Sequence, residues 1–322
     1  MLDEPTSRGS PMVLPVKTND LFPWAAPRPR VARLPGAAAL FAAILFGASP
    51  PAEAADDGTD GDYLSQWFDR VDKTQAEQPH WMTPMVTVTP RLEEEVRYDQ
   101  NWQRLPHNGA TLTNFDGGKG LELIPAERVE VLINAPPYQD RSWNGKTSPQ
   151  VNGFGDWPFL TVKYRIAAEN EQNGNYIVTA FLGASAPTGN DAFTNHQYVV
   201  TPTIAAGKGW GNFDVQSTLS YNVLTGRGAS VAPVAPAVAS NTAFQYHLGQ
   251  YFWPEFEVNY SYWYEGERVG LHQVLLTPGV IVGRFPIYGR LKLVAGLGYQ
   301  IAVTPTMPTY RNNLIATVRV PF

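Results

Sequence analysis

The chain has 322 residues, of which 43% are hydrophobic, 12% aromatic and only 16% charged, with a formal net charge of −5. Such a composition is unlike that of an ordinary helical enzyme, and the absence of a basic cluster argues against a nucleic-acid partner. The sequence contains no Cys, which excludes disulfides, thiolate metal sites and cysteine nucleophiles.

The first 54 residues carry the features of an export signal. Arg28, Arg30 and Arg33 precede an apolar stretch over residues 36–47, and Ala52-Glu53-Ala54 follows it. A basic region, a short apolar core and an A-x-A ending are typical of a secretory signal peptide, and this core is too short to span a bilayer. We therefore predict a signal peptide over residues 1–54; a membrane-anchoring amphipathic helix is the alternative.

Residues 55–82 are predicted to form a periplasmic leader that contains one short amphipathic helix. Apolar side chains recur there at helical spacing, opposite Asp69, Arg70 and Asp72; they are Tyr63, Leu64, Trp67, Phe68 and Val71. This helix is expected either to dock in the mouth of a barrel or to form a stub that covers nothing.

From about Met85 to Phe322 the apolar residues recur with a period of two, as they do along β-strands. In the last stretch Leu314, Ala316, Val318, Val320 and Phe322 fall on one face, and Arg311, Asn313, Thr317 and Arg319 fall on the other. The segments "FLTVKYRIA", "EFEVNYSYWYEGE" and "GRLKLVAGLGYQ" repeat this split. The alternation alone fits any half-exposed antiparallel sheet.

Three features favour a transmembrane barrel over a soluble sandwich. The predicted strands run about 10 to 15 residues, longer than the usual 5 to 6 or so, and a tilted membrane-spanning strand needs about 9 to 11. Aromatic residues gather at strand ends, as in interfacial girdles. Short and long connections also alternate. We predict an all-β fold, a closed antiparallel transmembrane β-barrel of about 12 strands over residues 83–322, with strands near 84–98, 110–115, 121–133, 156–168, 175–186, 195–207, 212–225, 240–252, 255–266, 271–284, 287–303 and 310–322.

This interpretation places the protein in the outer membrane of a Gram-negative-type bacterium, with both termini on the periplasmic side. The terminal Phe322 is expected to close the barrel at its periplasmic rim and to act as the signal that the barrel assembly machinery reads. The other expected partners are outer-membrane lipid and a small-molecule solute; the sequence leaves the oligomeric state open.

Strand parity then predicts the residues that line the pore. Lys or Arg facing lipid at the midplane costs about 2 to 4 kcal/mol, so these residues are assigned to the lumen. The predicted pore-lining residues are Arg91, Glu93, Arg97, Arg128, Glu130, Lys163, Arg165, Glu257, Arg290, Lys292 and Arg319. Glu94 falls on the lipid-facing parity and is an exception.

An enzymatic barrel is the competing interpretation, and a structural or adhesive barrel is another. The five histidines are His80, His107, His196, His247 and His272, and no G-x-S-x-G or H-E-x-x-H string accompanies them. The run Glu93-Glu94-Glu95 suggests a charge ladder rather than a metal site, because adjacent strand residues face opposite ways. We predict no catalytic residues, no metal and no cofactor.

Several stretches resemble the phenol-degradation meta-pathway family of outer-membrane transporters. They are "WMTPMVTVTPRLEEEVRYDQNW", "GGKGLELIPAERVEVLINAPPY", "FLGASAPTGND" and "TPTIAAGKGWGNFDVQSTLSYNV", and the likeness covers most of the chain after the signal. The resemblance implies passive uptake of small, aromatic or hydrophobic solutes through a barrel, without a cofactor. It supplies no catalytic residues.

Overall fold

The computed structural model describes residues 63–106, 109–116, 119–143, 150–225, 237–265 and 268–322, and almost all of its regular structure is antiparallel β-sheet. The predicted signal peptide lies outside the described residues. The strands are β1 (Glu95–Arg104), β2 (Ala110–Phe115), β3 (Leu121–Ala126), β4 (Val129–Ile133), β5 (Tyr138–Trp143), β6 (Val151–Phe154), β7 (Trp157–Glu169), β8 (Tyr176–Ala186), β9 (Tyr198–Trp210), β10 (Phe213–Tyr221), β11 (Val223–Thr225), β12 (Ala237–Tyr246), β13 (Phe252–Trp263), β14 (His272–Tyr288), β15 (Leu291–Ala302) and β16 (Asn312–Pro321).

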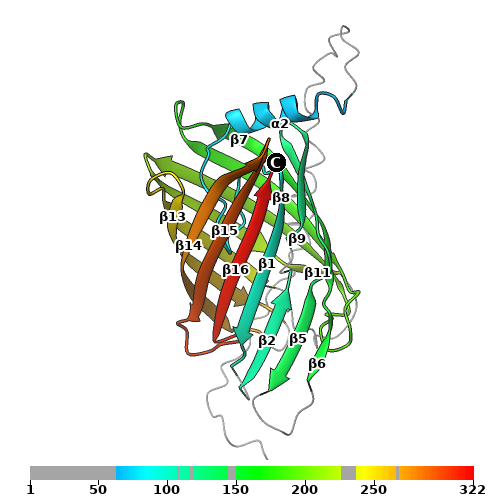
Figure 1. Cartoon of the computed structure of the whole chain (residues 1–322). Helices are drawn as coiled ribbons and strands as arrows, with labels where there is room; N and C mark the ends of the chain where they lie inside the picture. The colour runs from blue at the N-terminus through cyan, green and yellow to red at the C-terminus, as the bar shows by residue number, and fades with distance from the viewer. Residues whose placement is uncertain (1–62, 107–108, 117–118, 144–149, 226–236, 266–267) are drawn as a thin grey trace, which may run out of the picture.

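These strands form one closed barrel (Figure 1). Four of the strand positions around the barrel are each filled by two shorter strands in succession. These pairs are β2 and β3, β4 and β5, β6 and β7, and β10 and β11. One end of β1 pairs with β3 and the other with β2, so each such pair counts once around the barrel. The circuit closes where β1 pairs with β16, with Arg97 opposite Arg319. The protein is therefore a closed antiparallel barrel of 12 strands, as predicted.

The predicted bounds are wrong in the first third of the barrel. Residues 84–94 form no strand, and the predicted strand over 121–133 is the β3–β4 hairpin. The stretch expected to be one long loop after Ile133 contains β5 and β6. Pro136 and Pro137 interrupt this wall, and because Pro has no N–H to donate to a sheet, they hide the strand continuity in the sequence.

The two ends of the barrel differ in their connections. At the end that carries the C-terminus the turns are short, as between β9 and β10, whereas the connections at the other end are longer, as between β8 and β9. β16 runs to Pro321, and the backbone N–H of Phe322 donates to the Glu94 carbonyl at 3.1 Å. The chain thus ends at the β1–β16 closure, where the terminal alternation predicted it to lie.

The helix α2 (Trp67–Ala76) is shorter than the predicted amphipathic segment and crosses the short-turn end of the barrel (Figure 1). Its Asp72 carboxylate accepts two hydrogen bonds from Arg290, at 2.6 and 2.9 Å. On its inner face Val71 packs with Leu92 and Ile124. The helix therefore docks on the barrel mouth, although Phe68 remains half exposed instead of being buried.

The barrel is polar inside and apolar outside. On β16, Arg319 and Thr317 are almost fully buried, while Val318 is 45% exposed. On β13, Glu257 is fully buried and Phe256 is 41% exposed. The inward and outward faces follow the alternation predicted from the sequence. No helix in the described part of the chain is both long and apolar enough to cross a bilayer.

Candidate functional site

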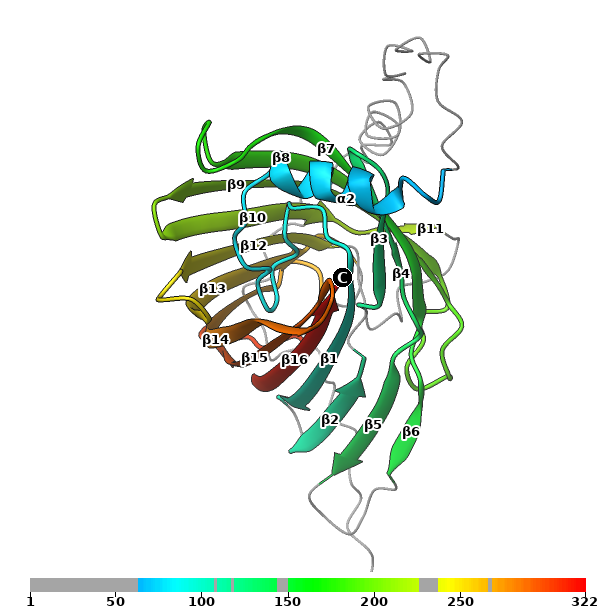
Figure 2. The same ribbon diagram turned by 45° about the horizontal axis from the view of Figure 1, so that its top comes forward.

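A segment inserted into the barrel dominates its lumen. Residues 77–94, here called the inserted segment, leave the end of α2, descend inside the wall and return to the start of β1 (Figure 2). Most of their side chains are buried against the wall. The nearly buried members are Gln78, Trp81, Met82, Thr83, Met85, Thr87, Thr89, Arg91, Leu92, Glu93 and Glu94. The lumen is therefore packed along much of its length.

Two glutamates of β13 hold the backbone of this segment from one side. The Glu257 carboxylate accepts hydrogen bonds from the backbone N–H groups of Val86, at 2.7 Å, and Thr87, at 2.6 Å, and from the Thr87 hydroxyl at 2.5 Å. Glu255 accepts one from the backbone N–H of Met85 at 3.2 Å. These two side chains supply acceptors for backbone N–H groups that would otherwise be buried without partners, so they anchor a stretch that has no strand partner of its own.

Arginines hold the carbonyl groups of the same stretch from other strands. Arg319 of β16 donates to the carbonyls of Thr83 and, at 2.8 Å, Pro84. Arg97 of β1 donates to the Met85 carbonyl at 2.6 Å. Donors and acceptors on the wall thus satisfy backbone groups that would otherwise be buried without partners.

A further arginine reaches the segment because of a bulge. Arg284 lies in β14 with φ of 60°, where the pairing with β15 shifts between Gly283 and Phe285. Strict alternation would turn this side chain outward, but a bulge re-aims it. Its guanidinium donates to the carbonyls of His80 and Trp81, both at 2.7 Å.

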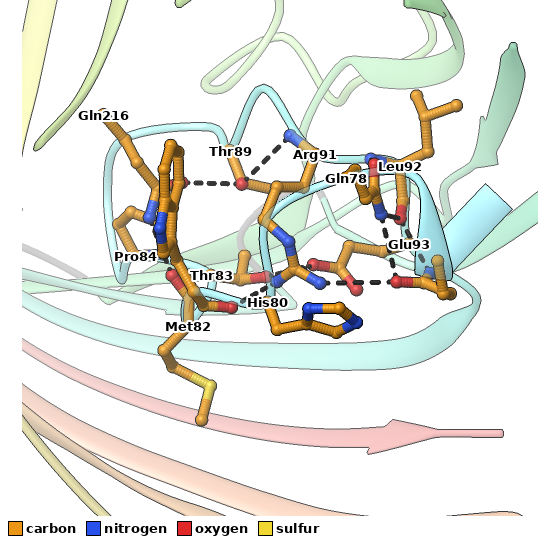
Figure 3. A network of polar contacts seen from close by, with 12 residues as sticks. Gln78, His80, Met82, Thr83, Pro84, Thr89, Arg91, Leu92, Glu93 and Gln216 are labelled. Atoms are coloured by element: carbon orange, nitrogen blue, oxygen red, sulfur yellow. Dashed lines mark hydrogen bonds and ion pairs between the residues drawn. The ribbon is translucent and has the colours of Figure 1, made fainter. Parts of the chain in front are cut away.

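Neutral side chains and an internal ion pair complete the network in Figure 3. The Arg91 guanidinium of the segment pairs with Glu93 at 2.8 Å and donates to the Trp81 carbonyl. Gln216 of β10 donates to the Met82 carbonyl at 2.9 Å and accepts from the Thr89 hydroxyl at 2.7 Å. Wall side chains from several strands therefore bond both N–H and carbonyl groups of the segment's backbone.

Inward-facing glycines make room for Trp81 and Met85 of the segment. A Cβ at Gly207 would lie 2.4 Å from the Trp81 ring, and one at Gly298 would lie 3.0 Å from the Met85 sulfur. Gly298 lies within β15, and a side chain there would meet Met85. The wall is shaped to fit this segment.

The structure divides the predicted pore-lining residues into three groups. Buried in the wall are Arg97, Glu130, Lys163, Arg165, Glu257 and Arg319; at the rim are Arg128, Arg290 and Lys292; on the inserted segment are Arg91 and Glu93. The prediction that Arg91 and Glu93 belong to a strand of the wall is wrong, because β1 begins only at Glu95.

Glu94 also needs correction, since it does not face outward. It is 3% exposed and accepts hydrogen bonds from the Trp67 indole N–H at 2.6 Å and from the Ile124 backbone N–H at 2.8 Å. The prediction that Glu94 faces outward extended the inward and outward alternation of β1 into residues that do not form a strand. Burial between α2 and β3 raises the pKa of its carboxyl.

The charge-based prediction missed a neutral polar wall. Inward-facing amides and hydroxyls bond to one another from β10 to β16, as when Asn259 accepts from both Thr277, at 3.1 Å, and Gln300, at 3.0 Å. The members of this wall are Gln216, Gln245, Asn259, Gln273, Thr277, Gln300 and Asn313, all nearly buried. They share the parity of the charged residues, so extending the parity rule to Asn, Gln and Thr would have found them.

Two of the cavities in the described part of the chain lie on opposite sides of the inserted segment. The inner cavity, about 470 Å³, lies beneath α2 and is lined by His80, Arg91, Glu93 and Arg284 among others. The outer cavity, about 220 Å³, lies toward the long-loop end and is bounded by Val88 at the tip of the segment. The segment separates the two.

The histidines and acids form no evident catalytic group in the described part of the chain. His80 Nδ1 lies 2.9 Å from the Glu171 carboxylate at the exposed rim, and the His247 ring stacks on Trp253. His107 lies outside the described residues. Among the residues that the structure describes, no three His, Asp or Glu side chains are grouped to hold a metal ion.

No protein-family model matches the sequence, and no curated protein matches it either. Among solved structures, an outer membrane channel from Pseudomonas putida F1 is similar, with a TM-score of 0.48 and 15% identity over 70% of this chain and 92% of that one. The NanC porin has a TM-score of 0.44 and 9% identity, covering 70% and 98% of the two chains. Outer membrane phospholipase A from Escherichia coli has a TM-score of 0.34 and 12% identity, covering 79% and 96%.

Proposed function

We propose that the protein is an outer-membrane channel that admits small solutes passively. The observation that carries this proposal is the inverted burial of the barrel, with Arg319 and Glu257 inside and Val318 and Phe256 outside. A soluble barrel would bury those apolar side chains, whereas in a lipid bilayer the apolar face contacts hydrocarbon and the polar face lines the lumen. Closure between β1 and β16 leaves no unpaired edge at that point.

The inserted segment sets the width of the path. A solute that enters from the long-loop end meets the outer cavity first, then the segment, then the inner cavity. Passage requires either the narrow space beside the segment or a displacement of residues 77–94. Because the segment is held by hydrogen bonds to wall side chains and not by strand pairing, it can move without opening the barrel.

The solute class and the route of biogenesis belong to the same proposal. The resemblance of the sequence to the phenol-degradation meta-pathway family supports small, aromatic or hydrophobic solutes. Export through residues 1–54 and recognition of Phe322 by the barrel assembly machinery would bring the chain to the outer membrane, with α2 on the periplasmic side. Lipid around the barrel and solute within it are the partners.

Conductance in planar bilayers tests the proposal. We expect the purified protein without residues 1–54 to insert and conduct weakly, and a variant in which residues 79–90 are replaced by a short Gly/Ser linker to conduct more. Folding of both is checked by heat-modifiable mobility on gels. Two folded barrels that neither conduct nor admit solutes into liposomes would contradict a channel. A hydrolase would instead release fatty acid or peptide products, and none are expected.

A further inference from the structure

The outer cavity has a chemistry of its own that the packed lumen does not require. Its walls come from β4, β7, β8, β9, β10 and β12, and Thr161, Thr203, Thr218 and Ser220 are among the residues that line it. Apolar surface is added by Leu132 and Phe181, which are 4% and 3% exposed. No Asp or Glu is among the described residues that line it. The cavity is thus a mixed polar and apolar pocket without negative charge.

Among the described residues that line this pocket, one carries a positive charge. Lys119, between β2 and β3, makes no ion pair or hydrogen bond with the described residues. The carboxylates whose charge acts on it already have partners, since Asp99 pairs with Arg97 at 2.9 Å and Glu122 lies 3.8 Å from Lys163. A partly buried amine that has no such partner favours an anion.

Asn134 also belongs to the wall of the pocket. Its amide N–H donates to the Pro158 carbonyl at 2.9 Å, and its Oδ1 atom is buried without accessible surface, so neither group is open to a ligand. The pocket therefore offers a cation for one end of a ligand and apolar surface for the rest of it.

The volume limits the ligand. An apolar cavity of about 150 Å³ holds one benzene molecule, so 220 Å³ admits a single ring with small substituents. We propose that the outer cavity is a selectivity site for a small organic acid with a single ring, with its carboxylate on Lys119 and its apolar body against Leu132 and Phe181. This inference deepens the proposed channel function and rests on it for its physiological meaning.

Binding is measured without transport, by equilibrium dialysis of the folded, detergent-solubilised protein against para-hydroxybenzoate. Para-hydroxybenzyl alcohol lacks the charge of the acid and is expected to bind about tenfold more weakly or worse, because a bond to a charged group is lost. Lys119→Gln removes the charge of the protein and is expected to weaken binding of the acid by a similar factor. Lys119→Arg should retain binding. Lys292→Gln, which removes a Lys at the exposed rim, is the matched control and should bind like the wild type.

Equal binding of the acid and the alcohol, or unchanged binding by Lys119→Gln, would overturn the proposal. If Lys119→Gln does not fold, the comparison of ligands on the wild type still decides. A barrel that conducts but does not bind the acid refutes the site alone, whereas one that binds the acid but never conducts refutes the channel.

Discussion

Substitution of Glu257, whose carboxylate binds the backbone of the inserted segment, is the most direct test of the lumen structure. Its carboxylate accepts three hydrogen bonds, from Val86 N–H, Thr87 N–H and the Thr87 hydroxyl, at 2.5 to 2.7 Å. Glu257→Ala removes all three and leaves two backbone N–H groups without these acceptors.

The magnitude follows from the number and kind of the bonds. A hydrogen bond to a charged group contributes about 1.5–3 kcal/mol, and such contributions do not add fully. With water able to replace part of the loss in the widened lumen, we expect the inserted state of the segment to be destabilised by about 3–5 kcal/mol. A change of about 3 kcal/mol shifts an equilibrium more than a hundredfold, so a displaced segment that is rare in the wild type should become detectable.

Single-channel recording in planar bilayers measures this shift as more frequent or larger openings. Glu265→Ala is the control, because Glu265 is an exposed residue after β13 and its loss removes the same charge without touching the segment. The remaining anchors, Arg97 and Arg319, are intact in both variants. If Glu257→Ala folds, as judged by heat-modifiable mobility, yet conducts like the control, the segment does not control the pore.

Three other predictions concern the closure, the wall and the docked helix. Deleting Phe322 should lower the amount of folded barrel in the outer membrane without lowering synthesis, because its N–H completes the β1–β16 closure; wild-type levels would show that this end is dispensable. Val318→Asp should lower the unfolding free energy in a urea titration, by less than the roughly 2–4 kcal/mol known for Arg or Lys at the midplane. Asn313→Asp should lower it less than Val318→Asp does, because residue 313 faces the lumen and its carboxylate does not contact lipid. A larger loss for Asn313→Asp than for Val318→Asp would mean that the register is off by one residue. The hydrogen bond from Arg290 lowers the pKa of Asp72 below its ordinary 3.8. The contribution of this pair to α2 docking is therefore present above pH 3.8 and is lost as the pH falls through the lowered pKa. A fluorophore on a cysteine introduced in α2 should report undocking in that pH range, and Arg290→Ala should abolish that transition.

The sequence by itself determined the class of fold and the inward or outward direction of most wall residues. Period-two alternation is a local property, so "LIATVRV" indicates without any long-range information that Arg319 and Val318 face different media. The cost of a charge in hydrocarbon then fixes which face is the lumen. The length of the strands and the number of turns gave the twelve-stranded count, even though the bounds of the first strands were wrong.

Only the tertiary structure decided what fills the barrel. The stretch "WMTPMVTVTPRLEE" alternates like a strand, and although Pro84 and Pro90 lack the N–H that strand pairing needs, nothing local shows that it lies inside the barrel. It lies in the lumen because Glu257, Arg319 and Arg97, distant in sequence, supply acceptors and donors for its backbone. Arg284 was missed for a similar reason, since the bulge that turns it inward is created by its pairing with β15. Alternation specifies which way a strand residue points, but the partner that a buried backbone group finds depends on the whole closed barrel.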